Sequence, residues 1–95
     1  MKQEYKHLYE KFGLNVVYYR KKKKLTQLQL AELVDIDRSH ISAIELGNVG
    51  VSFDVIFKLC EVLDIKPKDL FDFRDDGYPV PKTFEQTSNM VYTWK

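Results

Sequence analysis

The sequence predicts an all-α fold, a compact domain of five helices, and three observations support this prediction. Apolar residues recur at helical spacing through most of residues 3–71, as expected for helices that bury one face. Capping residues and glycine interrupt this pattern at short intervals, where helix boundaries belong. The composition, 44% hydrophobic and 31% charged over 95 residues, is that of one globular domain.

The first helix is predicted over residues 3–23. Glycine costs about 1 kcal/mol relative to alanine inside a helix, so Gly13 is expected to be a weak point. The buried stripe of this helix is expected to consist of Leu8, Phe12, Val16 and Tyr19.

The second helix is predicted to follow Thr26, whose hydroxyl can accept a hydrogen bond from an amide of the first turn. Ala31 is small enough for a close helix crossing. The apolar positions of this helix are Leu28, Leu30, Leu33 and Val34.

A third helix is predicted over residues 38–46, with Asp37 as its cap and Ile41 and Ile44 buried. Gly47 is expected to end it in the left-handed conformation. The second and third helices are therefore both very short and separated by almost nothing.

A fourth helix is predicted from Ser52 to about Asp64. A fifth is predicted within residues 66–73, with Pro67 in the first turn, where its missing N–H costs nothing. The inward residues of the fourth helix are expected to be Phe53, Ile56, Leu59, Cys60 and Leu63.

Residues 74–95 differ in character from the predicted domain at 1–73. Gly77, Pro79 and Pro81 mark a linker, and the last segment is readable either as an edge strand or as a helix. This extension is interpreted as a cover for the core of its own chain or as a dimerisation segment. The candidate dimerisation residues are Phe84, Val91, Tyr92 and Trp94.

Charge is unevenly distributed along the chain. Residues 1–47 carry nine Lys or Arg against six acids, a balance of +3, and residues 48–95 carry six against eight, a balance of −2. The basic excess is concentrated in Arg20–Lys24, directly before the second helix. Such a run is as often a solvated helix end as a nucleic-acid contact.

Several other classes of protein are disfavoured. No apolar run approaches the roughly 18 residues of a membrane helix, and the polar start is unlike a signal peptide. Cys60 has no cysteine to pair with, which favours a cytoplasmic location. No catalytic constellation accompanies it, so no enzyme activity, cofactor, metal or small-molecule ligand is expected.

Two of the short predicted helices lie within residues 26–47, TQLQLAELVDIDRSHISAIELG. Their close spacing along the chain requires an explanation other than the stability of each helix alone. Isolated helices below about 12–15 residues are marginal in water. The spacing fits a helix-turn-helix, in which the first helix lies across DNA phosphates and the second enters the major groove.

Residues 12–71 resemble the Cro and phage-repressor helix-turn-helix family, often called Xre, without a gap. The resemblance is carried by Gly13 with Arg20, by LTQ and LA within 25–31, by the pattern I--IE-G at 41–47, and by L---LDI---DLF at 59–71. It implies a DNA-binding transcriptional regulator. The chain departs from the family in its longer first helix, its extension, and a loop after the third helix that has neither cation nor proline.

The resemblance also implies roles for individual residues. Arg38 is the strongest candidate for base reading, because a guanidinium can bond guanine O6 and N7 together. Asp37 is interpreted mainly as a cap, and also as a filter that favours cytosine amino groups. The implied base-reading positions are Asp37, Arg38, Ser39, Ser42 and Ala43.

Phosphate contacts are expected around these positions. Gln27 matches the family glutamine at the start of the second helix, where free amides attract the same anion. His40 is interpreted either as a phosphate contact or as a half-exposed surface residue. The full expected set is Thr26, Gln27, Lys22, Lys23, Lys24, His40 and Asn48.

Arg20 and Glu45 match a pair that bridges the first and third helices in the family. A partly buried carboxylate needs a partner, and a bidentate arginine is the best available. The pair is expected to hold the reading helix at its angle.

The sequence therefore predicts a sequence-specific regulator of transcription, a homodimeric repressor on a palindromic operator in double-stranded DNA. The alternative is a protein-interaction module on the same fold, antitoxin-like or bridging, that does not read DNA. Gln27, Arg38 and the lysines favour DNA, because they converge on one edge of the predicted fold.

Overall fold

The computed structural model describes residues 2–73, and in this range every regular element is helical. A 3₁₀ turn, η1 (Gln3–Tyr5), leads into α1 (Lys6–Lys22). The other helices are α2 (Gln27–Val34), α3 (Arg38–Glu45), α4 (Phe53–Leu63) and α5 (Pro67–Leu70). The predicted all-α, five-helix fold is confirmed. The proposed extension and the four candidate dimerisation residues lie outside the described residues.

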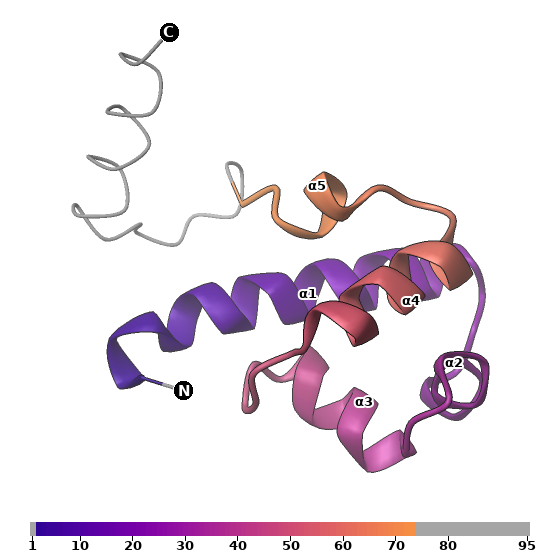
Figure 1. Cartoon of the computed structure of the whole chain (residues 1–95), viewed down its shortest axis with the longest axis horizontal. Coiled ribbons are helices and arrows are strands. Elements are labelled where there is room, and N and C mark those ends of the chain that lie inside the picture. Colours follow the sequence, from indigo (N-terminus) through magenta and orange to yellow (C-terminus); the bar gives the residue numbers. More distant parts are fainter. Residues whose placement is uncertain (1, 74–95) are drawn as a thin grey trace, which may run out of the picture.

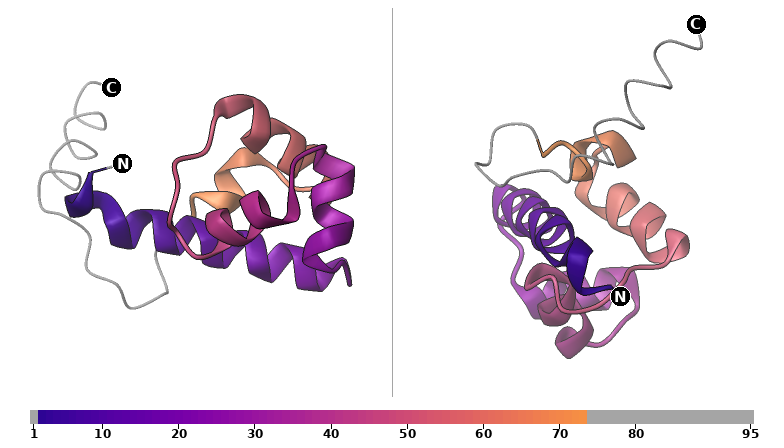
Figure 2. Two further views of the ribbon diagram at one scale, coloured as in Figure 1. Left: turned by 90° about the horizontal axis from the view of Figure 1, so that it is seen from below. Right: turned by 90° about the vertical axis from the view of Figure 1, so that its left-hand side faces the viewer.

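The long helix α1 organises the molecule. It runs along the longest axis in Figure 1, with α2 and α3 on one side of it and α5 on the other. Viewed from the end of α1 that carries the N-terminus, α4 lies beside it (Figure 2, right). The helices α1, α2, α3 and α4 all contribute to one core, because each carries a fully buried apolar residue: Val16, Leu30, Ile41 and Leu59. No helix among residues 2–73 combines the length and hydrophobicity that crossing a membrane requires.

The boundaries of α2 and α4 follow the predicted capping chemistry. The Thr26 hydroxyl accepts from the Gln29 amide at 3.0 Å, and the Gln29 side chain accepts from the Thr26 amide at 2.8 Å. This reciprocal box fixes the start of α2. Ser52 caps α4 in the predicted manner, by accepting from the Val55 amide at 3.2 Å.

Gly13 is not the weak point of α1 that helix propensity predicts. A Cβ at this position would collide with the backbone carbonyl oxygens of Ile44 and Glu45. The absence of a side chain therefore lets α1 cross the end of α3 at backbone contact. The cost in helix propensity is offset by this close packing.

Three residues of the predicted apolar patterns are exposed, including Phe53, which the sequence predicts to face inward. Leu28 and Leu33 are 53% and 51% exposed, because the buried stripe of α2 is the narrower set Leu30, Ala31 and Val34. Phe53 is 74% exposed, since it is the first residue of α4 and lies beyond the point where Ile56 closes the core. Its ring stacks on Phe57, with centroids 6.0 Å apart.

Candidate nucleic-acid interface

The outer face of α3 carries the predicted base-reading side chains. Arg38 and Ser39 are exposed in the first turn, while Ser42 and Ala43 follow one turn later and are half-buried. Ile41 and Ile44 on the opposite face are buried in the core. Residues three and four apart share a helix face, so these four positions form one surface. It carries short polar and small side chains with an arginine at its end, and we call it the reading face after its predicted role.

Leu46 belongs to this same surface and was missed by sequence reasoning. It follows Ser42 by four residues and Ala43 by three, and it is 61% exposed. Its assignment as a helix-ending residue hid its position on the reading face. An exposed leucine here can contact a thymine methyl group, which is the apolar feature of the major groove.

Asp37 occupies the N-cap position of α3, but its carboxylate makes no capping hydrogen bond. The His40 amide donates instead to the Asp37 main-chain carbonyl, at 3.0 Å. The expected capping role of the side chain is therefore wrong. The carboxylate is exposed at the start of the reading helix, where its proposed action on cytosine amino groups remains a prediction.

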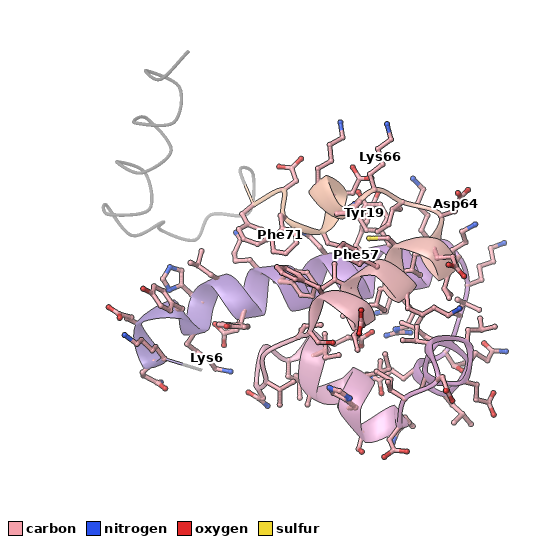
Figure 3. The ribbon with its side chains drawn as sticks, in the orientation of Figure 1. Lys6, Tyr19, Phe57, Asp64, Lys66 and Phe71 are labelled. Atoms are coloured by element: carbon pink, nitrogen blue, oxygen red, sulfur yellow. The ribbon has the colours of Figure 1, made fainter. Side chains whose placement is uncertain are left out.

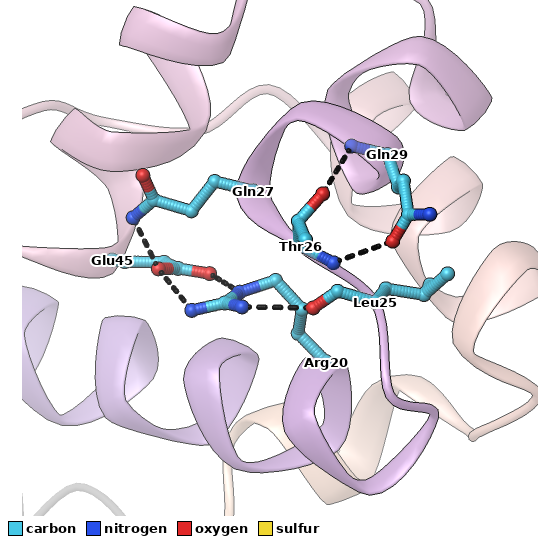
Figure 4. Close-up of polar contacts among 6 residues, drawn as sticks. All are labelled: Arg20, Leu25, Thr26, Gln27, Gln29 and Glu45. Atoms are coloured by element: carbon cyan, nitrogen blue, oxygen red, sulfur yellow. Dashed lines mark hydrogen bonds and ion pairs between the residues drawn. The ribbon is translucent and has the colours of Figure 1, made fainter.

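Arg20 and Glu45 are brought together by the crossing of α1 and α3 (Figure 4). The Arg20 Nε donates to Glu45 Oε2 at 2.6 Å and one terminal nitrogen donates to Glu45 Oε1 at 3.2 Å. The other terminal nitrogen donates to the Leu25 carbonyl at 2.9 Å. The side chains are only 11% and 4% exposed, so this bidentate pair is shielded from water.

Gln27 joins this pair. Its amide nitrogen donates to Glu45 Oε1 at 2.8 Å (Figure 4), so one carboxylate is shared by α1, α2 and α3. An amide nitrogen carries two hydrogens, and the second remains available to a phosphate. Gln27 is the first residue of α2, where the helix offers main-chain amides to the same anion.

The lysine run spans the end of α1, whose last two residues are Lys21 and Lys22. Lys21–Lys24 are all exposed, and Lys24 adopts a left-handed conformation with φ of 60°. The Lys22 ammonium lies 5.9 Å from the centroid of the Tyr18 ring. Only Leu25 and Thr26 separate the run from α2, so its cations are near the start of that helix. They also stabilise α1, because positive charge is favourable at the negative, C-terminal end of a helix dipole.

A lysine that sequence reasoning did not consider lies at the loop after α3. The Lys6 ammonium donates to the Gly47 carbonyl and to Asn48 Oδ1, both at 2.6 Å. The two partners are 41 and 42 residues away along the chain. Only the fold of α1 onto α3 brings them together, so no local sequence signal could have identified this contact. His40, the remaining phosphate candidate, is half-buried.

Residues with reactive side chains offer no second site in the described range. Cys60 is 7% exposed, and burial raises the pKa of its thiol, with a smaller contribution from the charge of Asp69. A thiol with a raised pKa is a poor nucleophile. Among residues 2–73, no group of three or more His, Cys, Asp or Glu could hold a metal ion.

An apolar groove of about 330 Å³ lies between the start of α1, the start of α4 and the segment after α5. Phe71, which is 50% exposed, lies on the opposite side of α1 from Lys6 (Figure 3). The groove is distinct from the reading face. It is lined by Leu8, Tyr9, Phe12, Val51, Phe53, Ile56, Phe71 and Phe73.

A helix-turn-helix family model matches residues 17–70. Control protein C.BamHI of Bacillus amyloliquefaciens is 42% identical over 67 residues, which cover 70% of this chain and 83% of that protein. The crystal structure of the restriction-modification controller protein C.AhdI from Aeromonas hydrophila superposes with a TM-score of 0.64 at 41% identity. That match covers 66% of this chain and 96% of the controller protein.

Two further proteins are less similar in sequence to this chain. The uncharacterized HTH-type transcriptional regulator MJ0272 of Methanocaldococcus jannaschii is 37% identical over 59 residues, 62% of this chain and 89% of the relative. The clp gene regulator ClgR from C. glutamicum superposes with a TM-score of 0.68 at 23% identity, over 78% of this chain and 96% of ClgR. At that identity the likeness concerns the fold alone.

Proposed function

The chain belongs to the Xre/Cro-type helix-turn-helix family of DNA-binding regulators, and we propose that it is a dimeric repressor that reads a palindromic operator through the outer face of α3. One observation carries this proposal. The reading face of α3 is exposed in its first turn, at Arg38 and Ser39, while Glu45 on the same helix is fixed to α1 and α2 by part-buried hydrogen bonds. A rigidly held helix with accessible polar side chains on its outer face is suited to sequence readout.

Cations and free donors flank this face on the α2 side. Gln27, Thr26 and the exposed run Lys21–Lys24 are proposed to contact phosphates, and the hydroxyl that caps α2 still has its proton to donate. Such contacts fix the register of the protein on the duplex, and the base contacts supply specificity. The 41% sequence identity to the restriction-modification controller protein C.AhdI favours control of a restriction-modification system, and the 42% identity to control protein C.BamHI favours a control function.

Selection of binding sites from random duplex DNA tests the proposal as a whole. The expected result is a two-fold symmetric sequence with half-sites about one helical turn, roughly 34 Å, apart. Enrichment of a single asymmetric half-site would refute the dimeric mode. No enrichment, together with no binding to bulk DNA, would refute DNA binding altogether.

Replacement of Arg38 by alanine is expected to weaken binding to the selected site by about 1–3 kcal/mol and to relax the preference at one base pair. The reason is that Arg38 is exposed in the first turn of α3, where a bidentate contact to guanine is geometrically available. Titrations with the selected duplex and with single-base variants measure both effects. An equal loss on specific and random DNA would make Arg38 a phosphate contact.

The apolar groove is proposed to be the dimer interface. Five of its lining residues are aromatic and come from the segments outside α2 and α3, so a second copy could pack there with both reading faces free. Aromatic side chains bury large areas at small entropic cost. Leu8 and Tyr9 belong to the N-terminal part of α1, where the first helix is longer than in the family it resembles.

Phe53→Ser is therefore expected to shift the protein toward monomer in sedimentation and to reduce affinity for the full palindrome far more than for a half-site. Leu33→Ser is the matched control, because Leu33 is also an exposed apolar residue, 51% against 74% for Phe53, but lies on α2. A chain ending at Phe73 separates the groove from the extension. If this short chain is monomeric while Phe53→Ser remains dimeric, the extension is the interface and the groove is not.

The protein-interaction alternative has one observation in its favour, the exposure of Leu28 and Leu33 on α2. Scattered exposed leucines are normal on soluble proteins. Leu33→Ser serves again here: if the unmodified chain binds no DNA but captures a partner protein, and Leu33→Ser loses that capture, the alternative is supported.

A further inference from the structure

The loop between α3 and α4 has no cation of its own. Residues 46–52 read LGNVGVS, whereas the resemblance implies a basic residue after the third helix. Within the described residues, the ammonium of Lys6 reaches this loop from the start of α1 (Figure 3). Its side chain is 28% exposed, so it is anchored at the loop without being sealed from solvent.

We propose that Lys6 supplies the phosphate-binding cation of this loop, together with Asn48, and so extends the DNA-binding surface to the side of α3 away from the lysine run. The proposal rests on the proposed function. It assigns a DNA contact to a residue whose position in the sequence, before the region matched by the family model, gives no indication of one.

The hydrogen bonds around Lys6 support this role. An ammonium group has three donors, and two of them bind the Gly47 carbonyl and Asn48 Oδ1. Both acceptors are neutral, so they orient the ammonium without cancelling its charge. Because Asn48 accepts through Oδ1, its amide nitrogen is left with two donors. Lys6 and Asn48 thus offer a charged and a neutral donor at one place.

Glu10 is the competing group. Its carboxylate lies 4.0 Å from the Lys6 ammonium, one turn along α1, and is 38% exposed. At this distance and exposure the pair is worth little. A phosphate that arrives at the loop can therefore compete for the ammonium. The same geometry implies that Glu10 weakens DNA binding by repelling the phosphate.

A purely structural role for Lys6 makes a different prediction. The Gly47 carbonyl lies just after the end of α3, and a lysine there can stabilise the helix through its unpaired carbonyls and dipole. That role would affect the stability of the fold. It would leave the number of ions released on DNA binding unchanged.

The salt dependence of DNA affinity in the full-length protein separates the two roles. Each neutralised phosphate contributes about 0.9 to the slope of log K against log salt. Lys6→Met is expected to reduce the slope by about that amount, equally on selected and random duplexes, while Lys6→Arg retains the slope. Glu10→Gln is expected to strengthen binding at low salt.

Two controls fix the interpretation. Lys68→Met, on α5 across α1 from α3 (Figure 1), should leave the slope unchanged, and Lys23→Ala should reduce it. If Lys6→Met lowers unfolding stability but not the slope while Lys23→Ala lowers the slope, the proposal is overturned and Lys6 is a structural tie. If the unmodified chain binds no DNA, it is the proposed function that fails.

Discussion

Replacement of Glu45 by alanine is expected to destabilise the fold by about 3–5 kcal/mol, the usual cost of removing one partner from a buried ion pair. The Arg20 guanidinium would lose both bonds to the carboxylate and keep only its bond to the Leu25 carbonyl. Gln27 would lose the acceptor for its amide. Urea denaturation measures the change as a lower midpoint at an unchanged slope.

The chain contains a matched control for this prediction. Lys58 and Glu61 form an ion pair at 3.1 Å on α4, with side chains 45% and 72% exposed. Exposed pairs of this kind contribute about 0.2–1 kcal/mol. A double-mutant cycle should thus give strong coupling for Arg20 with Glu45 and weak coupling for Lys58 with Glu61. Additive effects at Arg20 and Glu45 would show that the bridge does not stabilise the fold.

Gly47→Ala is the second change with a large expected effect. Gly47 has φ of +73°, a left-handed conformation that costs an ordinary residue about 1–2 kcal/mol. An added Cβ would also lie 2.6 Å from the backbone nitrogen and Cα of Glu10, and overpacking adds about 1–3 kcal/mol. Backbone atoms cannot move aside like the end of a flexible side chain. The expected total is a loss of about 2–5 kcal/mol in denaturation.

Gly50 provides the comparison, because it lies in the same loop without these constraints. A Cβ there would have its nearest neighbour, the Tyr9 ring, at 3.9 Å, which is ordinary contact. Gly50→Ala is therefore expected to change stability by no more than about 0.5 kcal/mol. Similar losses at both glycines would mean that general loop entropy, and not the contact with α1, is responsible.

Much of the fold was predictable because its signals are local. Thr26, Ser52 and Gly47 each mark a helix boundary by their own chemistry, and all three act as predicted. The errors concern which side of a short helix is buried. Eight residues make barely two turns, so Leu28 and Leu33 satisfy a periodic pattern equally well facing in or out. Only the positions of the neighbouring helices decide.

The candidate site shows the same division. Arg38, Ser39, Ser42 and Ala43 could be placed on one face because they belong to a single helix. The partnership of Gln27 with Glu45 and that of Lys6 with Asn48 join separate helices and loops. No spacing along the chain encodes them. Gly13 is the clearest case, since its helix propensity gives no sign that an added Cβ would collide with the backbone of α3.

Residues on the exposed face of α3 can be substituted at little cost in stability, whereas residues on its buried face cannot. Arg38 and Ser39 support none of the described packing, so substitutions there can redirect the protein to a new operator at little cost in stability. Glu45, in the last turn, is held by two other helices and cannot change alone. Duplicated copies of such a gene could therefore acquire separate DNA targets by surface substitutions, without first acquiring a more stable fold.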